Sequence, residues 1–80
     1  MRIDKFLKVS RIVKRRTVAQ EACAEEKVVI NGKAAKPSAK IKLGDVVELH
    51  YATGVLKFKI VNMKETVKKE EASSLYEVII

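Results

Sequence analysis

The pair Asn31-Gly32 is the feature that most restricts how this chain can fold. It stands between two β-prone runs in the stretch VVINGKAA. Asn and Gly accept the positive φ angles of the two-residue turn whose twist matches that of adjacent antiparallel strands. The sequence therefore predicts a tight β-hairpin with its turn at Asn31 and Gly32.

Further strands are expected after this hairpin. The turn Leu43-Gly44-Asp45 leads into VVELHY, and VLKFKIV at 55–61 places apolar residues on one face and lysines on the other. This alternation with a period of two is typical of an antiparallel sheet with one wet face. A polar segment with at most one loose helical turn follows, and the run SLYEVII at 74–80 is expected to pair with a sheet edge.

A short first helix is predicted at the N-terminal end of the chain. Ile3, Phe6 and Leu7 recur at roughly helical spacing. Asp4 falls in the first turn, where a negative charge interacts favourably with the helix dipole, or at the cap. The apolar side of this helix should face the core.

A second amphipathic helix is predicted between residues 17 and 26. Its small apolar residues share one side, namely Val18, Ala19, Ala22 and Cys23. Extending the helix backwards would place Arg15 within this apolar stripe, so we expect the helix to begin near Arg15 or Arg16. The fold class is then α+β, with two short N-terminal helices packed on a small, mostly antiparallel sheet.

Positive charge is concentrated at the start of the chain. The formal net charge is +7, and residues 1–16 contain seven Lys or Arg against Asp4 alone, which makes +6 for this segment. Five further lysines stand against Asp45 between residues 27 and 45. Such segregation favours a polyanionic partner, because neutralised phosphates release condensed counterions. Charge by itself leaves a solvated lysine-rich face as an equal alternative.

Residues for catalysis or metal binding are scarce. Cys23 and His50 are the single cysteine and histidine, and no Gly-rich phosphate loop is present. We therefore expect no enzyme activity, no cofactor and no metal site, with Cys23 a small buried residue and His50 on the surface. A lone cysteine fits a reducing compartment, and apolar runs of a few residues cannot span a bilayer, so a cytoplasmic location is expected.

Aromatic residues number four, and at least Phe6 and Phe58 are in phase with the core. Base stacking is therefore not the expected way to bind nucleic acid. Contact with phosphates and recognition of shape remain, through basic side chains displayed on a rigid pair of helices.

Four stretches, RIDKFLK, KRRTVA, VVINGK and LGDVV, together resemble in order and spacing the RNA-binding domain of ribosomal protein S4, also called the αL motif. The resemblance covers residues 1 to about 50. It implies two helices packed on a small curved sheet, with structured RNA bound by the helices and the adjoining hairpin. It further implies RNA-facing positions for Arg2, Lys5, Arg11, Arg15 and Arg16, flanked by Lys8, Lys14 and Lys33.

Several positions refine this resemblance. Asp4 aligns with a family carboxylate that we interpret as a helix cap or an orienting partner for arginine. Arg2 and Arg16 are expected on the solvent side. If the resemblance extends to binding of large ribosomal subunits, charge reversal at either position should abolish that association and leave the fold intact. Glu26 replaces a usual Gly, so its backbone either avoids positive φ or is mildly strained. Arg15 replaces a small hydroxyl residue, which weakens the cap and adds a phosphate contact.

The segment TVKKEEA at 66–72 extends the resemblance to standalone family members of bacterial ribosome-associated quality control. This implies one RNA-binding domain over residues 1–80, with a core motif at 1–50 and a C-terminal strand extension at about 55–80. It also implies a monomer that binds the rRNA and peptidyl-tRNA of an obstructed large ribosomal subunit. An RqcH-type factor on the same subunit would bring alanyl-tRNA for untemplated alanine tailing.

Three alternatives remain at this point. One is the small heat-shock member of the same family, also a large-subunit binder, which typically carries a longer basic tail, whereas this chain ends in LYEVII. Another is a non-ribosomal nucleic-acid-binding or protein-docking module. The last is the detached front domain of an RNA-modifying enzyme, which the missing catalytic domain disfavours.

Overall fold

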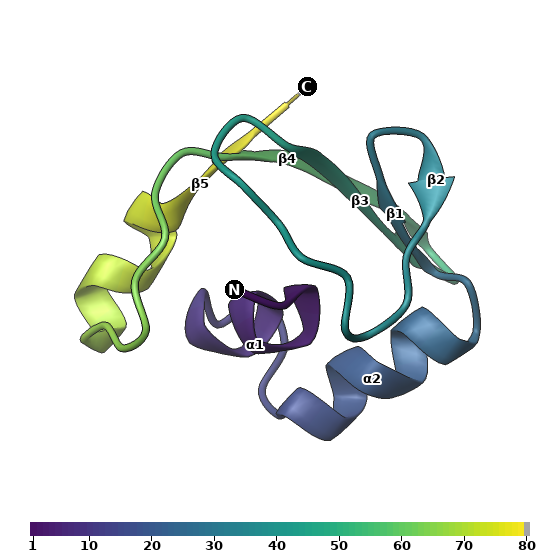
Figure 1. Cartoon of the computed structure of the whole chain (residues 1–80), viewed down its shortest axis with the longest axis horizontal. Helices are drawn as coiled ribbons and strands as arrows, with labels where there is room; N and C mark the ends of the chain where they lie inside the picture. The colour runs from purple at the N-terminus through teal and green to yellow at the C-terminus, as the bar shows by residue number, and fades with distance from the viewer. Residues whose placement is uncertain (80) are drawn as a thin grey trace.

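A computed structural model describes residues 1–79 and shows a curved sheet arching over a layer of two helices (Figure 1). The helical elements are α1 (Ile3–Val9), α2 (Arg16–Ala24) and a 3-10 helix, η1 (Lys69–Leu75). The strands are β1 (Val28–Ile30), β2 (Lys33–Ala34), β3 (Val46–Tyr51), β4 (Gly54–Ile60) and β5 (Tyr76–Val78). All pairings are antiparallel, in the order β2-β1-β3-β4-β5. The predicted α+β class is confirmed.

Helix α1 follows its predicted apolar spacing. Ile3, Phe6 and Leu7 are completely buried against the sheet. The chain leaves the helix at Arg11, whose φ of +62° is left-handed. The Val13 N–H then donates to the Leu7 carbonyl at 3.0 Å. Glycine is the usual residue at such a helix end, since a side chain there costs roughly 1 kcal/mol.

Helix α2 begins at Arg16 as expected, with Arg15 in extended conformation at its N-cap. Ala19 and Cys23, one turn apart, face the core. Val18 was expected on the same side, but it is 44% exposed, because it lies about 100° around the helix from Ala19 in the first turn. None of the helices in residues 1–79 is long and apolar enough to cross a membrane.

The predicted hairpin forms between β1 and β2, with Asn31 and Gly32 at φ +50° and +86°. Asn31 also reaches beyond its own turn. Its side-chain amide donates to Asp45 at 3.0 Å, and its side-chain oxygen accepts the Val46 N–H at 2.9 Å. Buried Asp45 thus ties the hairpin to the start of β3.

Strands β3 and β4 supply the sheet side of the core. Val47, Leu49, Phe58 and Ile60 are buried, and the lysines of β4 point to solvent, as the alternation predicts. The rings of Phe6 and Phe58 stack with centroids 6.3 Å apart, which joins α1 to the middle of the sheet.

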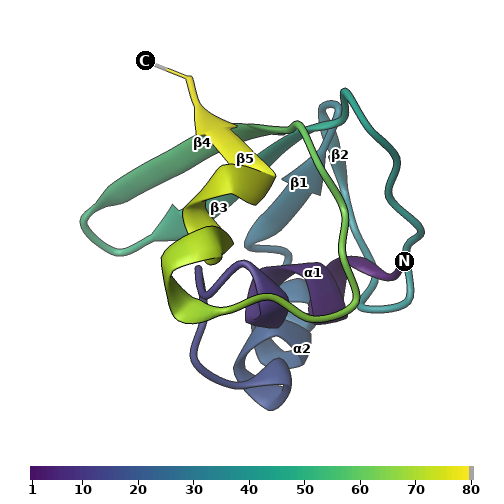
Figure 2. The same cartoon turned by 90° about the vertical axis from the view of Figure 1, so that its left-hand side faces the viewer.

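The C-terminal part completes the layer beside α1. Figure 2 shows η1 and β5 along the edge of the sheet at β4. Ala72 and Leu75 of η1 are buried, and the Val61 N–H donates to the Leu75 carbonyl at 3.0 Å. The predicted final strand is confirmed for Tyr76–Val78, whereas Ile80 lies outside the described residues.

Candidate RNA-binding surface

The surface is organised around Asp4, a completely buried carboxylate in the first turn of α1. Arg2 Nη2 lies 3.1 Å from Asp4 Oδ2, and Arg16 approaches both carboxylate oxygens, with Nη2 3.3 Å from Oδ1 and Nε 3.2 Å from Oδ2. Gln20 Nε2 donates to Oδ2 at 3.0 Å, and the Lys5 N–H donates to Oδ1 at 2.8 Å. We call Asp4, Arg2, Arg16 and Gln20 the Asp4 clamp.

The Asp4 clamp keeps its carboxylate ionised. Burial by itself raises the pKa of Asp4, but hydrogen bonds from Gln20, Arg16 and the Lys5 N–H outweigh it, so the net pKa is lowered from 3.8. Two of these donors belong to α2, so the charged form of Asp4 also holds the two helices together. The interpretation of Asp4 as an orienting partner for arginine agrees with this geometry.

The expected placement of Arg2 and Arg16 on the solvent side is confirmed, but the expectation that charge reversal there leaves the fold intact needs a correction. Their side chains are 46% and 43% exposed, and both are anchored on the buried carboxylate rather than free in solvent. A glutamate at either position would face Asp4 across a few ångströms, so charge reversal there would disturb the fold as well as the surface. Each guanidinium has five N–H donors, so the anchored arginines retain donors for an outside acceptor.

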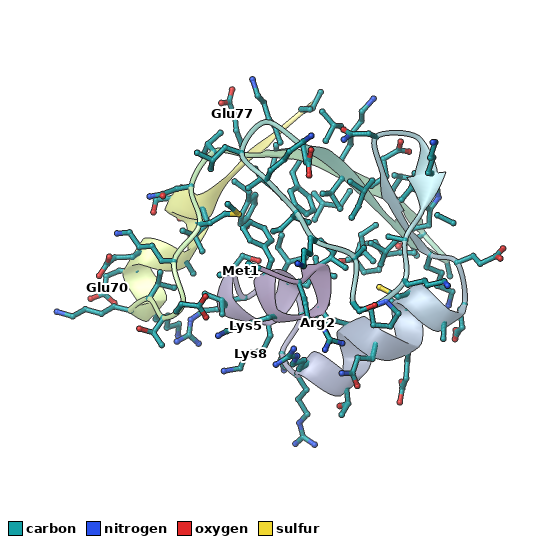
Figure 3. The ribbon with its side chains drawn as sticks, viewed as in Figure 1. Met1, Arg2, Lys5, Lys8, Glu70 and Glu77 are labelled. Atoms are coloured by element: carbon teal, nitrogen blue, oxygen red, sulfur yellow. The ribbon has the colours of Figure 1, made fainter. Side chains whose placement is uncertain are left out.

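Lys5 and Lys8 extend the positive surface along α1. Figure 3 places Arg2, Lys5 and Lys8 on the side of α1 away from the sheet. Lys5 Nζ pairs with Glu65 of the C-terminal segment, and this hydrogen bond, together with the positive charge, lowers the pKa of Glu65. The charge of Lys5 is therefore already partly balanced within the protein.

Lys8, Arg11 and Lys14 line one cavity of about 280 Å³. Its opposite wall is formed by Glu65, Thr66 and Val67, which follow β4 in the chain. Three candidate cations thus converge on a concave surface that only the C-terminal segment completes. Arg11 carries its charge there in spite of its unfavourable left-handed backbone.

The remaining candidates lie apart from this cavity. Arg15 is exposed at the N-cap of α2. Its side chain makes no cap hydrogen bond, as expected where arginine replaces a hydroxyl residue. Lys33 is exposed on β2, at the other end of the sheet from β5. Glu26 adopts φ +60°. Its backbone therefore does not avoid positive φ and takes the mildly strained conformation instead.

Cys23 and His50 occupy the expected places. Cys23 is buried on α2, and burial raises the pKa of its thiol, with the charge of Asp4 raising it further. This disfavours the nucleophilic thiolate. The His50 side chain is 43% exposed on β3, with Nε2 3.6 Å from Glu48.

Two partners, one of Asp4 and one of Lys5, could not be identified from the sequence. Gln20 is a polar residue of α2 that would ordinarily face solvent, yet it binds Asp4. Its position four residues after Arg16, on the same helix face, is the signal that could have suggested this. Glu65 is sixty residues from Lys5, and no local pattern connects the two.

Comparison with known proteins assigns the family. The S4 domain matches residues 1–47. The RQC P-site tRNA stabilizing factor of Halalkalibacterium halodurans is 50% identical over 98% of this chain and 89% of its own length. The protein of the same name from Streptococcus pneumoniae is 47% identical over 99% of this chain and 90% of its own.

A solved structure shows the same fold. Trimeric heat shock protein 15 of Vibrio cholerae superimposes with a TM-score of 0.91 at 29% identity, covering 99% of this chain and 81% of that one. The heat shock protein is thus less similar in sequence than the stabilizing factors. The chain therefore belongs to the S4 domain family, and within it to the group of RQC P-site tRNA stabilizing factors.

Proposed function

We propose that this protein is a non-catalytic, cytoplasmic RNA-binding factor of ribosome-associated quality control. It binds obstructed large ribosomal subunits through rRNA and peptidyl-tRNA and, with an RqcH-type factor, supports untemplated alanine tailing of stalled chains. Residues 1–80 act as one RNA-binding domain, and the protein works as a monomer. Its RNA-binding residues are Arg2, Lys5, Lys8, Arg11, Lys14, Arg15, Arg16 and Lys33.

The Asp4 clamp is the observation that carries this proposal. It fixes two half-exposed arginines between α1 and α2, next to the lysines of α1. Preorganised cations lose little side-chain entropy on binding, so they suit the fixed phosphate geometry of folded RNA. The names of the relatives, which refer to stabilizing P-site tRNA, supply the ribosomal context.

Heat-shock-type recycling of large subunits is the second candidate, favoured by the close superposition on heat shock protein 15. Copurification separates the two. A tagged copy acting in quality control should bring down large subunits with tRNA and the alanine-delivering factor. Recovery of subunits without that factor would favour the recycling role, and recovery of no ribosomal RNA would contradict both.

The RNA-binding surface is tested best without disturbing the Asp4 clamp. The double variant Lys8→Gln/Arg11→Gly removes two charges, and glycine suits the left-handed backbone at position 11. Thermal stability should be unchanged or slightly higher. Association with large subunits should weaken on the order of tenfold at about 150 mM salt, and the slope of log K against log salt should flatten by about 1.5.

The matched control is Lys57→Gln/Lys59→Gln, which removes the same charge from the outer face of the sheet. This variant should bind large subunits nearly as the parent does. Equal weakening by the two double variants would mean that net charge, rather than the surface around α1, governs binding. Size measurement in solution tests the monomer, which a trimer like that of the Vibrio protein would contradict.

A further inference from the structure

The segment between β4 and η1 places a hydroxyl group beside a cluster of cations. Thr66 lines the cavity of about 280 Å³ together with Lys8, Arg11 and Lys14. Against these three cations the lining contains one acid, Glu65. Thr66 is exposed, and residues 61–68 form no helix or strand. The hydroxyl is therefore accessible and lies at a cavity with an excess of positive charge.

The backbone around Thr66 is held in place on both sides of this residue. Glu65 pairs with Lys5 of α1, and Val67 packs against the hydrophobic core. In Figure 2 the segment between β4 and η1 runs past α1. Thr66 thus keeps its position at the cavity while the residue itself remains open to solvent.

The same segment already presents one anion to α1. The hydrogen bond from Lys5 and its positive charge lower the pKa of Glu65, which favours the charged glutamate. Lys8 follows Lys5 by three residues and so lies on the same face of α1. A negative charge at Thr66, directly after Glu65, meets the next cation along that face at the shared cavity.

A phosphate on Thr66 matches the chemistry of this cavity. Phosphothreonine carries about −1.5 to −2 charges at pH 7 and has three strong acceptor oxygens. Arg11 offers a planar fork that can donate two parallel hydrogen bonds to a phosphate, and Lys8 and Lys14 add point charges. The added charge balances the excess of cations in the lining.

The other exposed serine and threonine hydroxyls in residues 1–79 lack this setting. Thr17, Ser73 and Ser74 lie within helical elements, and Thr53 lies in the turn between β3 and β4. Ser38 stands beside lysines, but it lies in a turn, and no arginine lines the groove to which it belongs. A modifying enzyme reaches an irregular exposed segment most readily, which favours the hydroxyl at the cavity.

We propose that Thr66 is a phosphorylation site, and that the modified side chain occupies the cavity and weakens RNA binding. This inference rests on the proposed function. A protein kinase transfers the γ-phosphoryl group of ATP to the Thr66 hydroxyl oxygen. The new P–O bond forms there, the bond between the γ-phosphorus and the bridging oxygen breaks to release ADP, and the hydroxyl proton passes to a base of the kinase. The bound phosphate then competes with RNA for Lys8, Arg11 and Lys14.

The test uses the full chain phosphorylated at Thr66, made with a genetic code expanded for phosphothreonine. Phosphorylation of Thr66 should raise the melting temperature by roughly 4–8 °C, because the phosphate joins the C-terminal segment to α1. Association with large subunits should weaken on the order of tenfold at about 150 mM salt. The matched control is the chain phosphorylated at Thr53, which lies outside the cavity and should keep both values close to those of the unmodified protein.

The variant Lys8→Gln/Arg11→Gly identifies where the phosphate lies. In this background, phosphorylation of Thr66 should raise the melting temperature by less than about half as much. An equal rise in both backgrounds, or no rise in the parent, would overturn the cavity as the phosphate site. Equal weakening of subunit association by phosphate at Thr66 and at Thr53 would overturn the regulatory role.

Failure of the proposed function gives a different result. If the unmodified protein does not bind large subunits, the proposed function fails and the regulatory role fails with it. The thermal comparison needs no RNA, so it still decides whether the cavity holds the phosphate.

The modification itself is tested in the cells that contain this protein. Protein recovered from growing and from translation-arrested cells, with phosphatases inhibited, should carry a phosphate that peptide fragmentation maps to Thr66. The variant Thr66→Val, which lacks the hydroxyl, should carry none in that peptide. Absence of phosphate at Thr66 under both conditions would overturn the proposal, even if the cavity can hold the modified side chain.

Discussion

The two sides of this small protein use charge in opposite ways. On the outer face of the sheet, lysines and glutamates oppose each other in register, Glu48 with Lys57 and Lys59 with Glu77. On the side of α1, the buried acid Asp4 holds two arginines, and the exposed acid Glu65 pairs with Lys5. In Figure 3, Glu77 lies on the sheet, away from Arg2, Lys5 and Lys8.

This difference shows why the net charge of +7 describes the surface poorly. Opposite charges in register across neighbouring strands attract each other and stabilise the sheet modestly. Cations anchored on a buried carboxylate keep an outward field, and their positions are fixed. Lys57 and Lys59 therefore count toward the total charge, and we expect them to contribute little to recognition of a polyanion.

The largest effect, on the free energy of unfolding, is expected from breaking the Asp4 clamp. Asp4→Ala removes the carboxylate that holds Arg2, Arg16 and Gln20, and should lower the free energy of unfolding by about 2–3 kcal/mol. The half-exposed arginines can turn to water, which limits the loss. Denaturant unfolding measures this change. The matched control Glu48→Gln on the outer face should change stability by less than about 0.5 kcal/mol, and equal losses would contradict the contrast.

The pH dependence of a second variant of the same residue, Asp4→Asn, sharpens this test. The pKa of Asp4 is lowered in the folded state, so its stabilisation is complete above the unfolded value of 3.8 and is lost as pH falls through the lower folded value. The stability difference between the parent and Asp4→Asn should therefore stay constant at neutral pH and shrink below about pH 4. A difference that persists unchanged at pH 2 would mean that the charge of Asp4 does not hold the clamp.

An intermediate effect, on RNA affinity, is expected from replacing the glutamates that oppose lysines on the outer face of the sheet. Glu48→Lys/Glu77→Lys places lysines opposite lysines and should raise affinity for non-specific duplex RNA roughly tenfold at about 50 mM salt. Large-subunit association in competition with that duplex should not improve, because the new charges lack a fixed arrangement. Filter binding measures both affinities. Equal gains for both ligands would show that charge density alone is sufficient.

The smallest effect is expected at the ion pair between Lys5 and Glu65. Glu65→Gln releases Lys5 from its counter-charge and should tighten RNA binding about two- to threefold at low salt, with the gain vanishing near 1 M salt. Glu70→Gln, which changes the charge equally on η1, is the matched control. A gain of the same size from both would assign the effect to net charge rather than to Lys5.

Much of the fold follows from local patterns. Asn31-Gly32 predicts its hairpin because few residues accept two successive positive φ angles, and the alternation in β4 predicts which side chains are buried. Even the start of α2 follows from the cost of placing Arg15 in an apolar stripe. The candidate cations could be named in advance, though only from a family resemblance added to their charge.

The sequence could not predict which charged and polar side chains contact one another. Gln20 and Glu65 look like ordinary solvated residues, and only the packing of α2 and of the C-terminal segment on α1 makes them partners of Asp4 and Lys5. Local pattern determined the helices, the hairpin and the supply of positive charge, since backbone preferences and apolar periodicity act over a few residues. Tertiary structure decided which charges are anchored, cancelled or free, because electrostatic interactions depend on distances across elements far apart in the chain.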